Sequence, residues 1–318
     1  MEDFWPIIGS VLGVFLVMAI GAFCRRREWL TREADRSLAN LAANIMLPAY
    51  FISRILEDPE LASLTTAWAP PLFGFVATTV GFAVGLLFAR KIGPLIGLDS
   101  DSKQRAFALC VGICNYGYIP LPLAETFYPE AMLQLILHNV GVDLALWSVG
   151  VAIISGVPGR GWRRVMISPP FLAVIFACLM KATIDTDDLP IAMMSTVRGL
   201  GDCAIPMGLL LSGAIIVDFL GDWSWFRVSA VNVSAIVIRQ LILPSLMILA
   251  VVGIGLSVEM REVVLLQAAM PAAVFPIVLV RLYGRDTETS IKVILSTSLA
   301  GIFLIPAWLL AGRWLLGV

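Results

Sequence analysis

Long apolar segments dominate this sequence and leave few folds open to it. A helix needs about 20 mostly apolar residues to cross the bilayer core. Hydrophobic residues make up 59% of the chain and charged residues 14%, whereas soluble domains contain about 45–50% and about 25%. We therefore expect an all-α polytopic membrane protein. Its ten transmembrane helices are expected at 5–23, 38–54, 69–89, 106–127, 132–155, 169–183, 191–217, 233–256, 263–281 and 290–313.

The composition excludes several classes of protein. The apolar content excludes an ordinary soluble enzyme and a disordered scaffold. The net charge of −1 creates no field that would recruit nucleic acid. The five cysteines show no paired loop spacing, and the single histidine, His138, excludes a multi-histidine zinc site. No glycine-rich phosphate loop is present, so direct drive by ATP is not expected. We expect contact with membrane lipid, and no nucleic acid, metal or cofactor.

The distribution of basic residues predicts an orientation. Clusters such as Arg25–Arg27 and Arg90–Lys91 fall in alternate loops, while the loops between them are acidic or neutral. Cytoplasmic loops carry an excess of Lys and Arg, so both termini are expected on the non-cytoplasmic side of the cell (inner) membrane. Glu2 and Asp3 make the amino end acidic, which argues against a cleavable signal peptide.

The ten predicted helices divide into two sets of five, at residues 1–155 and 156–318. If the halves share a fold, an odd number of helices gives them opposite orientations, as in many secondary transporters. Weak sequence similarities between the halves support a shared fold, for example Asn44–Pro48 in the second helix and Cys203–Pro206 in the seventh. We expect two domains, each a five-helix repeat, related by inversion.

The fourth and ninth helices are predicted to be broken. The segments 112–122 and 267–276 each hold two prolines in mid-span. Proline removes a backbone hydrogen bond, and in lipid the freed groups must be satisfied by protein or by a wet cavity. Matched breaks indicate a binding site, and the amino ends of half-helices favour an anion. The candidate substrate-binding residues are Asn44, Asn115, Tyr116, Gly117, Pro122, Met270, Pro271 and Pro276.

Three ionisable residues inside apolar runs are candidates for ion coupling. Asp143 lies near the middle of the fifth helix, with His138 pointing away from its face, and Asp202 lies in the seventh helix. A buried carboxylate usually faces a bundle interior or a cavity. Two roles therefore remain open for Asp143. It either contacts substrate or couples transport to protons, or else it is a neutral acid hydrogen-bonded to a neighbouring helix. Arg239 is expected to extend towards the cytoplasmic surface.

An enzymatic alternative also remains open. Gly199–Asp202 matches the Gly-x-Gly-Asp pattern of intramembrane aspartyl proteases, and Asp143 could supply the second carboxylate. However, Val142 stands where those proteases have a tyrosine, and their Pro-Ala-Leu motif is missing. We favour a protein that is not an enzyme.

Taken in order, the motifs resemble those of the auxin efflux carrier family, the bacterial relatives of the plant PIN transporters. The resemblance covers nearly the whole chain, and no single motif carries it. The similar segments are Asn44–Phe51, Asn115 to Pro122, Trp147, Gly201–Ala204, Arg239–Leu241 with Pro244, Gln267–Pro271 with Pro276, and Leu295–Thr297.

The resemblance implies ten helices in two inverted repeats of five, similar to the sodium/proton antiporter and bile-acid symporter fold. It implies that helices 4 and 9 cross at Pro122 and Pro276, and that Asn115 binds an anion. It further implies elevator-type alternating access, small organic acids as substrates and a homodimer. Two positions depart from the family: Pro120 replaces a glycine, and Ser168–Pro170 replaces an Asn-Pro-Asn motif, which argues against auxin-like specificity. A symporter for a sterol-like or cationic substrate on the same scaffold remains an alternative.

Overall fold

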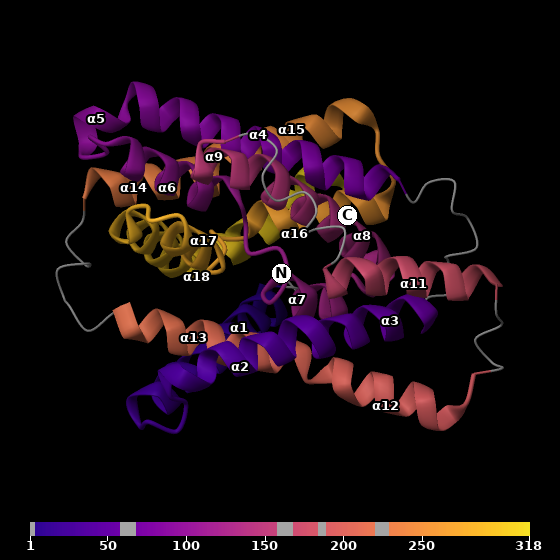
Figure 1. Cartoon of the computed structure of the whole chain (residues 1–318). Helices are drawn as coiled ribbons and strands as arrows, with labels where there is room; N and C mark the ends of the chain where they lie inside the picture. The colour runs from indigo at the N-terminus through magenta and orange to yellow at the C-terminus, as the bar shows by residue number, and fades with distance from the viewer. Residues whose placement is uncertain (1–3, 58–67, 158–167, 184–188, 220–228) are drawn as a thin grey trace.

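The computed structural model describes residues 4–57, 68–157, 168–183, 189–219 and 229–318. These residues form helices and no named strand (Figure 1). Within these residues, seven helices are long and apolar enough to cross a membrane, which agrees with the expected polytopic class. They are Trp5–Arg26, Arg32–Glu57, Ala69–Lys91, Pro129–Ser155, Ile191–Asp218, Ala230–Ile254 and Thr287–Leu316.

The count of seven differs from the expected ten for a physical reason. The helix Pro169–Thr183 is apolar but short. The other two expected spans are interrupted, since each consists of two shorter helices separated by a non-helical segment. Neither half alone reaches the length of about 20 residues that a bilayer requires. The ten-span arrangement therefore stays a prediction.

One group of helices, which we call the small bundle, packs through small residues. A Cβ at Gly21 would lie 2.0 Å from the carbonyl oxygen of Leu210, and one at Gly213 would lie 1.8 Å from that of Met18. These glycines let the backbones of the first and seventh expected spans touch, as is common between membrane helices. The bundle consists of α1 (Phe4–Arg26), α2 (Arg32–Leu41), η1 (Ala42–Met46), α3 (Leu47–Glu57), α11 (Pro169–Thr183), α12 (Ile191–Asp202) and α13 (Ala204–Phe219).

The remaining helices form a second group, the crossing bundle. Here too glycines allow close contact, because a Cβ at Gly141 of α8 would lie 1.8 Å from the Pro71 carbonyl oxygen of α4. The bundle consists of α4 (Ala69–Lys91), α5 (Gly93–Ile96), α6 (Asp101–Gly112), α7 (Pro120–Phe127), η2 (Pro129–Ala131), α8 (Met132–Ala145), η3 (Leu146–Gly150), α9 (Val151–Ser155), α14 (Ala230–Val237), η6 (Ile238–Ile242), α15 (Leu243–Ile254), α16 (Val258–Ala269), α17 (Pro276–Leu282) and α18 (Thr287–Leu316).

Figure 1 shows α2, α3, α12 and α13 at the bottom of the view and α4, α5, α14 and α15 at the top, with α7 between them. Each bundle contains helices from both halves of the sequence.

The two broken helices start alike. Ser100 caps α6 by accepting the Lys103 N–H (3.3 Å), and Ser257 caps α16 by accepting the Met260 N–H (3.4 Å).

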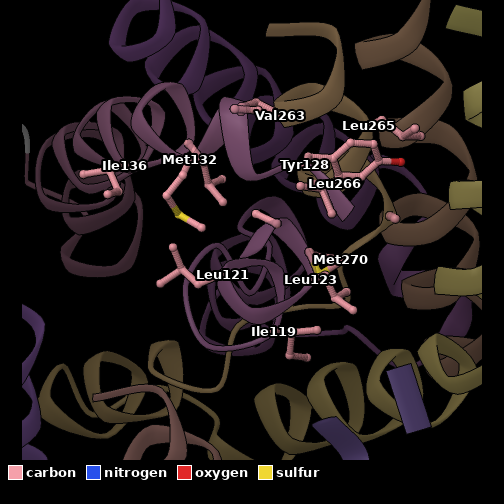
Figure 2. Close-up of a cluster of buried hydrophobic side chains, with 14 of the residues drawn as sticks. Ile119, Leu121, Leu123, Tyr128, Met132, Ile136, Val263, Leu265, Leu266 and Met270 are labelled. Carbon is pink, nitrogen blue, oxygen red and sulfur yellow. The ribbon is translucent and has the colours of Figure 1, made fainter. Parts of the chain in front are cut away.

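An apolar cluster holds the broken helices together. Leu121 and Leu123 of α7 pack with Met132 and Ile136 of α8 and with residues of α16, all of them buried (Figure 2). In a bilayer such contacts stabilise through close packing, since lipid is as apolar as leucine. The labelled members from the second broken helix are Val263, Leu265, Leu266 and Met270.

Candidate functional site at the helix crossing

Two non-helical stretches of backbone, extended where they meet, cross inside the crossing bundle. The first crossing segment, residues 113–119, joins α6 to α7, and the second, residues 270–275, joins α16 to α17. They run antiparallel and meet at an isolated bridge between Cys114 and Ala272. The prolines at the starts of α7 and α17 explain where each helix resumes, because proline favours the first turn.

The crossing satisfies backbone groups that the broken helices leave free. The Asn115 N–H donates to the Pro271 carbonyl (2.7 Å), and the Ala273 N–H donates to the Ile113 carbonyl (3.2 Å). The two bonds are related by the symmetry of the bridge, so Ala273 is the counterpart of Asn115. In lipid, extended backbone persists only with such partners.

Gln267 of α16 ties the first crossing segment to α8. It is fully buried, and its Nε2 donates to the Tyr116 carbonyl (3.2 Å) and to Asn139 Oδ1 (3.0 Å). Its Oε1 accepts from the Cys114 thiol (3.1 Å). The Tyr116 hydroxyl donates to Asp143 Oδ1 (2.6 Å), one helical turn beyond Asn139. A continuous polar chain therefore connects the crossing to the carboxylate of the fifth expected span.

Unpaired backbone donors lie beside Asn115, whose side chain is only 6% exposed. The N–H groups of Gly117, Tyr118 and Ile119 make no hydrogen bond to any residue that the structure describes. A Cβ at Gly117 would meet nothing within 4 Å, so the space there is open. Successive free N–H groups form a concavity suited to an anion.

The structure brings most of the predicted binding residues together. Asn115, Tyr116 and Gly117 lie on the first crossing segment, Met270 and Pro271 on the second, and Pro276 begins α17. Pro122 lies within the first turn of α7. Their role in binding stays a prediction.

Three predicted residues lie apart from this network. Asn44 is exposed in η1 and donates to the Asn40 carbonyl of its own helix (2.8 Å). Asp202 is exposed at the end of α12 and lies 3.8 Å from the guanidinium of Arg54. His138 faces α4, and within the described part of the chain its ring nitrogens make no hydrogen bond of standard geometry.

Other residues that the structure joins to the site were not among the candidates. Asn139 shares a helix face with Asp143, which the spacing of four residues signals. Thr297 of α18 accepts a hydrogen bond from the Ala272 N–H (3.2 Å). No local sequence pattern indicates this contact. Arg239, expected to extend to the surface, is 3% exposed instead, because η6 turns it into the bundle.

The first crossing segment also contacts the small bundle. A Cβ at Gly208 of α13 would lie 1.9 Å from a ring carbon of Tyr118. Nearby, Glu125 of α7 accepts a hydrogen bond from the Tyr50 hydroxyl of α3 (2.8 Å) and pairs with Arg54. These contacts place the crossing at the boundary between the two bundles. Among the described residues no three metal-ligating side chains gather.

Comparisons with known proteins identify the family and several relatives of this chain. The pattern of a protein family described as "Membrane transport protein" matches residues 6–161 and 156–309. An uncharacterized transporter of Methanothermobacter thermautotrophicus is 22% identical over 94% of this chain and 96% of the relative. The uncharacterized transporter YfdV of Escherichia coli is 20% identical over 96% of this chain and 98% of the relative. The chain therefore belongs to this family of membrane transport proteins, the auxin efflux carrier family that its sequence resembles.

Proposed function

We propose that this membrane transporter is a secondary carrier of a small organic anion, in particular a carboxylate. The observation that carries the proposal is the crossing, where the N–H groups of Gly117 to Ile119 have no partner among the described residues and open space adjoins Gly117, two positions from Asn115. A carboxylate accepts such backbone and amide donors well. Met270, Pro271, Pro122 and Pro276, which lie at the breaks of the two helices, would shape the same region.

The proposed transport step moves the crossing bundle against the small bundle, as in an elevator. The contacts of α1 with α13 and of α3 with α11 support two inverted repeats, since they pair spans 1 with 7 and 2 with 6. The boundary between the bundles holds a polar cluster, Tyr50, Arg54 and Glu125, whose bonds can break and re-form. A site beside this boundary is exposed first to one side of the membrane and then to the other.

Asp143 is the proposed coupling residue, because the Tyr116 hydroxyl links its carboxylate to the crossing. Protonation would remove the negative charge of the Asp143 carboxylate, weaken the hydrogen bond that it accepts from Tyr116, and so alter the first crossing segment. Asp202 pairs with Arg54 outside the polar chain, and the His138 ring faces α4, so we propose Asp143 as the main coupling group and these two residues as additional candidates. Asn44 would contribute from the small bundle.

The alternatives have less support. Asp143 and Asp202 have separate partners, Tyr116 and Arg54, and no hydrogen bond joins them as proton sharing in a protease would require. No contact favours a sterol-like or cationic substrate. We retain the inner membrane, non-cytoplasmic termini and a homodimer as proposals from the sequence.

Uptake into proteoliposomes tests the proposal. Wild-type protein would be given a panel of labelled dicarboxylates, malonate included, with and without a pH gradient. We expect saturable uptake of at least one acid and a loss of about ten-fold or more in Asn115→Ala, since a hydrogen bond to a charged group contributes about 1.5–3 kcal/mol. Asp143→Asn should remove the dependence on the pH gradient.

Asn40→Ala is the matched control, because Asn40 is exposed and contributes only its carbonyl to a described bond. It should transport like wild type. Folded protein that carries no organic anion under any gradient would overturn the carboxylate proposal. Equal uptake in wild type and Asn115→Ala would remove the crossing as its site.

A further inference from the structure

Arg239 lies where a charged side chain is costly. It belongs to η6, within the apolar helix Ala230–Ile254, and is 3% exposed. Its Nε and Nη2 atoms are buried without a hydrogen-bond partner in the described structure. A guanidinium in this position normally pairs with an anion or with backbone carbonyls. The fold therefore presents a buried positive charge with donors still to satisfy.

Arg239 lines a cavity of about 400 Å³ between α4 and α15. His138, which also lines it, is 1% exposed, and among the described residues neither of its ring nitrogens makes a hydrogen bond of standard geometry. The rest of the lining is mostly apolar, with Leu72 and Val76 from α4 and Leu246 from α15. One cavity thus combines a cationic end with an apolar wall, and its volume falls in the range of small-molecule sites.

This cavity differs from the proposed transport site. It reaches the first crossing segment at Cys114, whereas Tyr118 of the same segment faces Gly208 of the small bundle. In Figure 1, α4 and α15 lie side by side at the top, away from α2 and α12. Leu72, Val76 and Leu246 are exposed on that surface. The cavity opens towards the apolar exterior of the crossing bundle.

We propose that this cavity binds an amphiphilic carboxylate from the membrane, namely a medium-chain fatty acid. The carboxylate accepts hydrogen bonds from the Arg239 guanidinium and from one His138 N–H, and the chain lies along the aliphatic side chains of α4 and α15. Charge complementarity selects an acid over a neutral lipid. The inference does not depend on the proposed function, because it concerns binding at a separate site.

Binding of labelled dodecanoate to the full chain in phosphatidylcholine nanodiscs tests the inference. We expect saturable binding that unlabelled dodecanoate displaces and that dodecanol and acetate do not. Arg239→Gln should weaken binding by about ten-fold or more, as the loss of a charged hydrogen-bond donor implies. Arg239→Lys should retain part of the affinity because it keeps the charge. Arg198→Gln, which removes an exposed arginine from α12, should bind like wild type.

A second variant keeps the charge and fills the space. Ala77→Phe places a ring in the cavity wall, so it should abolish binding even though Arg239 remains. If Arg239→Gln does not fold, Ala77→Phe and the competition with dodecanol and acetate still test whether the cavity binds the fatty acid. Equal displacement by dodecanol or by acetate would overturn the inference, as would unchanged affinity in folded Arg239→Gln or Ala77→Phe.

Discussion

The two crossing segments share a backbone path but differ in their side chains. The first carries Asn115, Tyr116 and Tyr118, while its counterpart at 270–275 is apolar throughout. The first faces the small bundle through Tyr118 and Gly208. The second is held within its own bundle, where Thr297 accepts the Ala272 N–H and Gly301 lies against Pro271. Similar backbones therefore serve different ends: one segment presents polar groups at a boundary, and the other supports it.

The largest expected effect comes from replacing Gln267, the residue that joins the two crossing segments. Gln267→Leu leaves the Tyr116 carbonyl, Asn139 and the Cys114 thiol without their shared partner. Each buried polar group left unpaired costs about 1–3 kcal/mol, although hydrogen bonds between membrane helices average about 0.6 kcal/mol. We expect a loss of about 2–3 kcal/mol in the free energy of unfolding, measured by denaturation in micelles.

Uptake by Gln267→Leu should also fall by about ten-fold, because the first crossing segment loses its anchor. The matched control is Gln134→Leu on α8, because the buried Oε1 of Gln134 has no hydrogen-bond partner among the described residues. That variant should be as stable as wild type or more so. Equal destabilisation by both variants would contradict the role of Gln267.

The next effect tests the exposed side of the first segment. Gly208→Ala would place a Cβ 1.9 Å from the Tyr118 ring, so the segment or α13 must shift. Overpacking of this kind costs about 1–3 kcal/mol, and uptake should decrease several-fold. Gly199→Ala, in α12, meets nothing within 4 Å and should leave uptake rates unchanged. An active Gly208→Ala carrier would show that this contact is dispensable.

A smaller effect is expected from replacing Thr297, which supports the second crossing segment. Thr297→Val keeps the shape of the side chain but removes the acceptor of the Ala272 N–H. We expect a loss of about 1 kcal/mol in the free energy of unfolding, with Thr297→Ser close to wild type. Thr196→Val on the exposed face of α12 provides the comparison. If thermal unfolding does not distinguish Thr297→Val from that control, the second segment needs no such anchor.

The smallest effect concerns a contact that the two broken helices share. Asp101, at the start of α6, accepts hydrogen bonds from Arg105 (2.7 Å) and from Arg285 (3.2 Å), which follows α17. The bond from Arg105 lowers the pKa of the Asp101 carboxyl below its ordinary value of 3.8. Asp101→Asn should cost about 0.5 kcal/mol at neutral pH, as expected for a largely exposed pair.

The pH dependence of that effect has a definite sign. A carboxyl whose pKa is lowered by folding stabilises the protein above its unfolded pKa, and this contribution disappears as the pH falls through the folded pKa. The difference in melting temperature between wild type and Asp101→Asn should therefore be constant at neutral pH, begin to shrink near pH 3.8 and disappear as the pH falls through the lower pKa of the folded protein. A difference that grows on acidification would contradict the assignment.

Local patterns in the sequence predicted the positions of the breaks, because proline acts on its own helix. The breaks at 112–122 and 267–276 correspond to the observed crossing segments. Pairing across the crossing could not be predicted in the same way. Gln267 and Asn139 are 128 positions apart, and only the packing of α16 on α8 brings them together. For the same reason the sequence did not reveal that Asp202 pairs with Arg54 or that Arg239 is buried.

By itself, the sequence determined that this is a helical membrane protein of the auxin efflux carrier family. It also determined which prolines break the helices. Hydropathy and proline geometry depend only on neighbouring residues, so both can be read along the chain. The tertiary structure decided which polar groups share a site. Buried polar groups must find partners wherever the packed helices supply them, and here those partners come from distant parts of the chain.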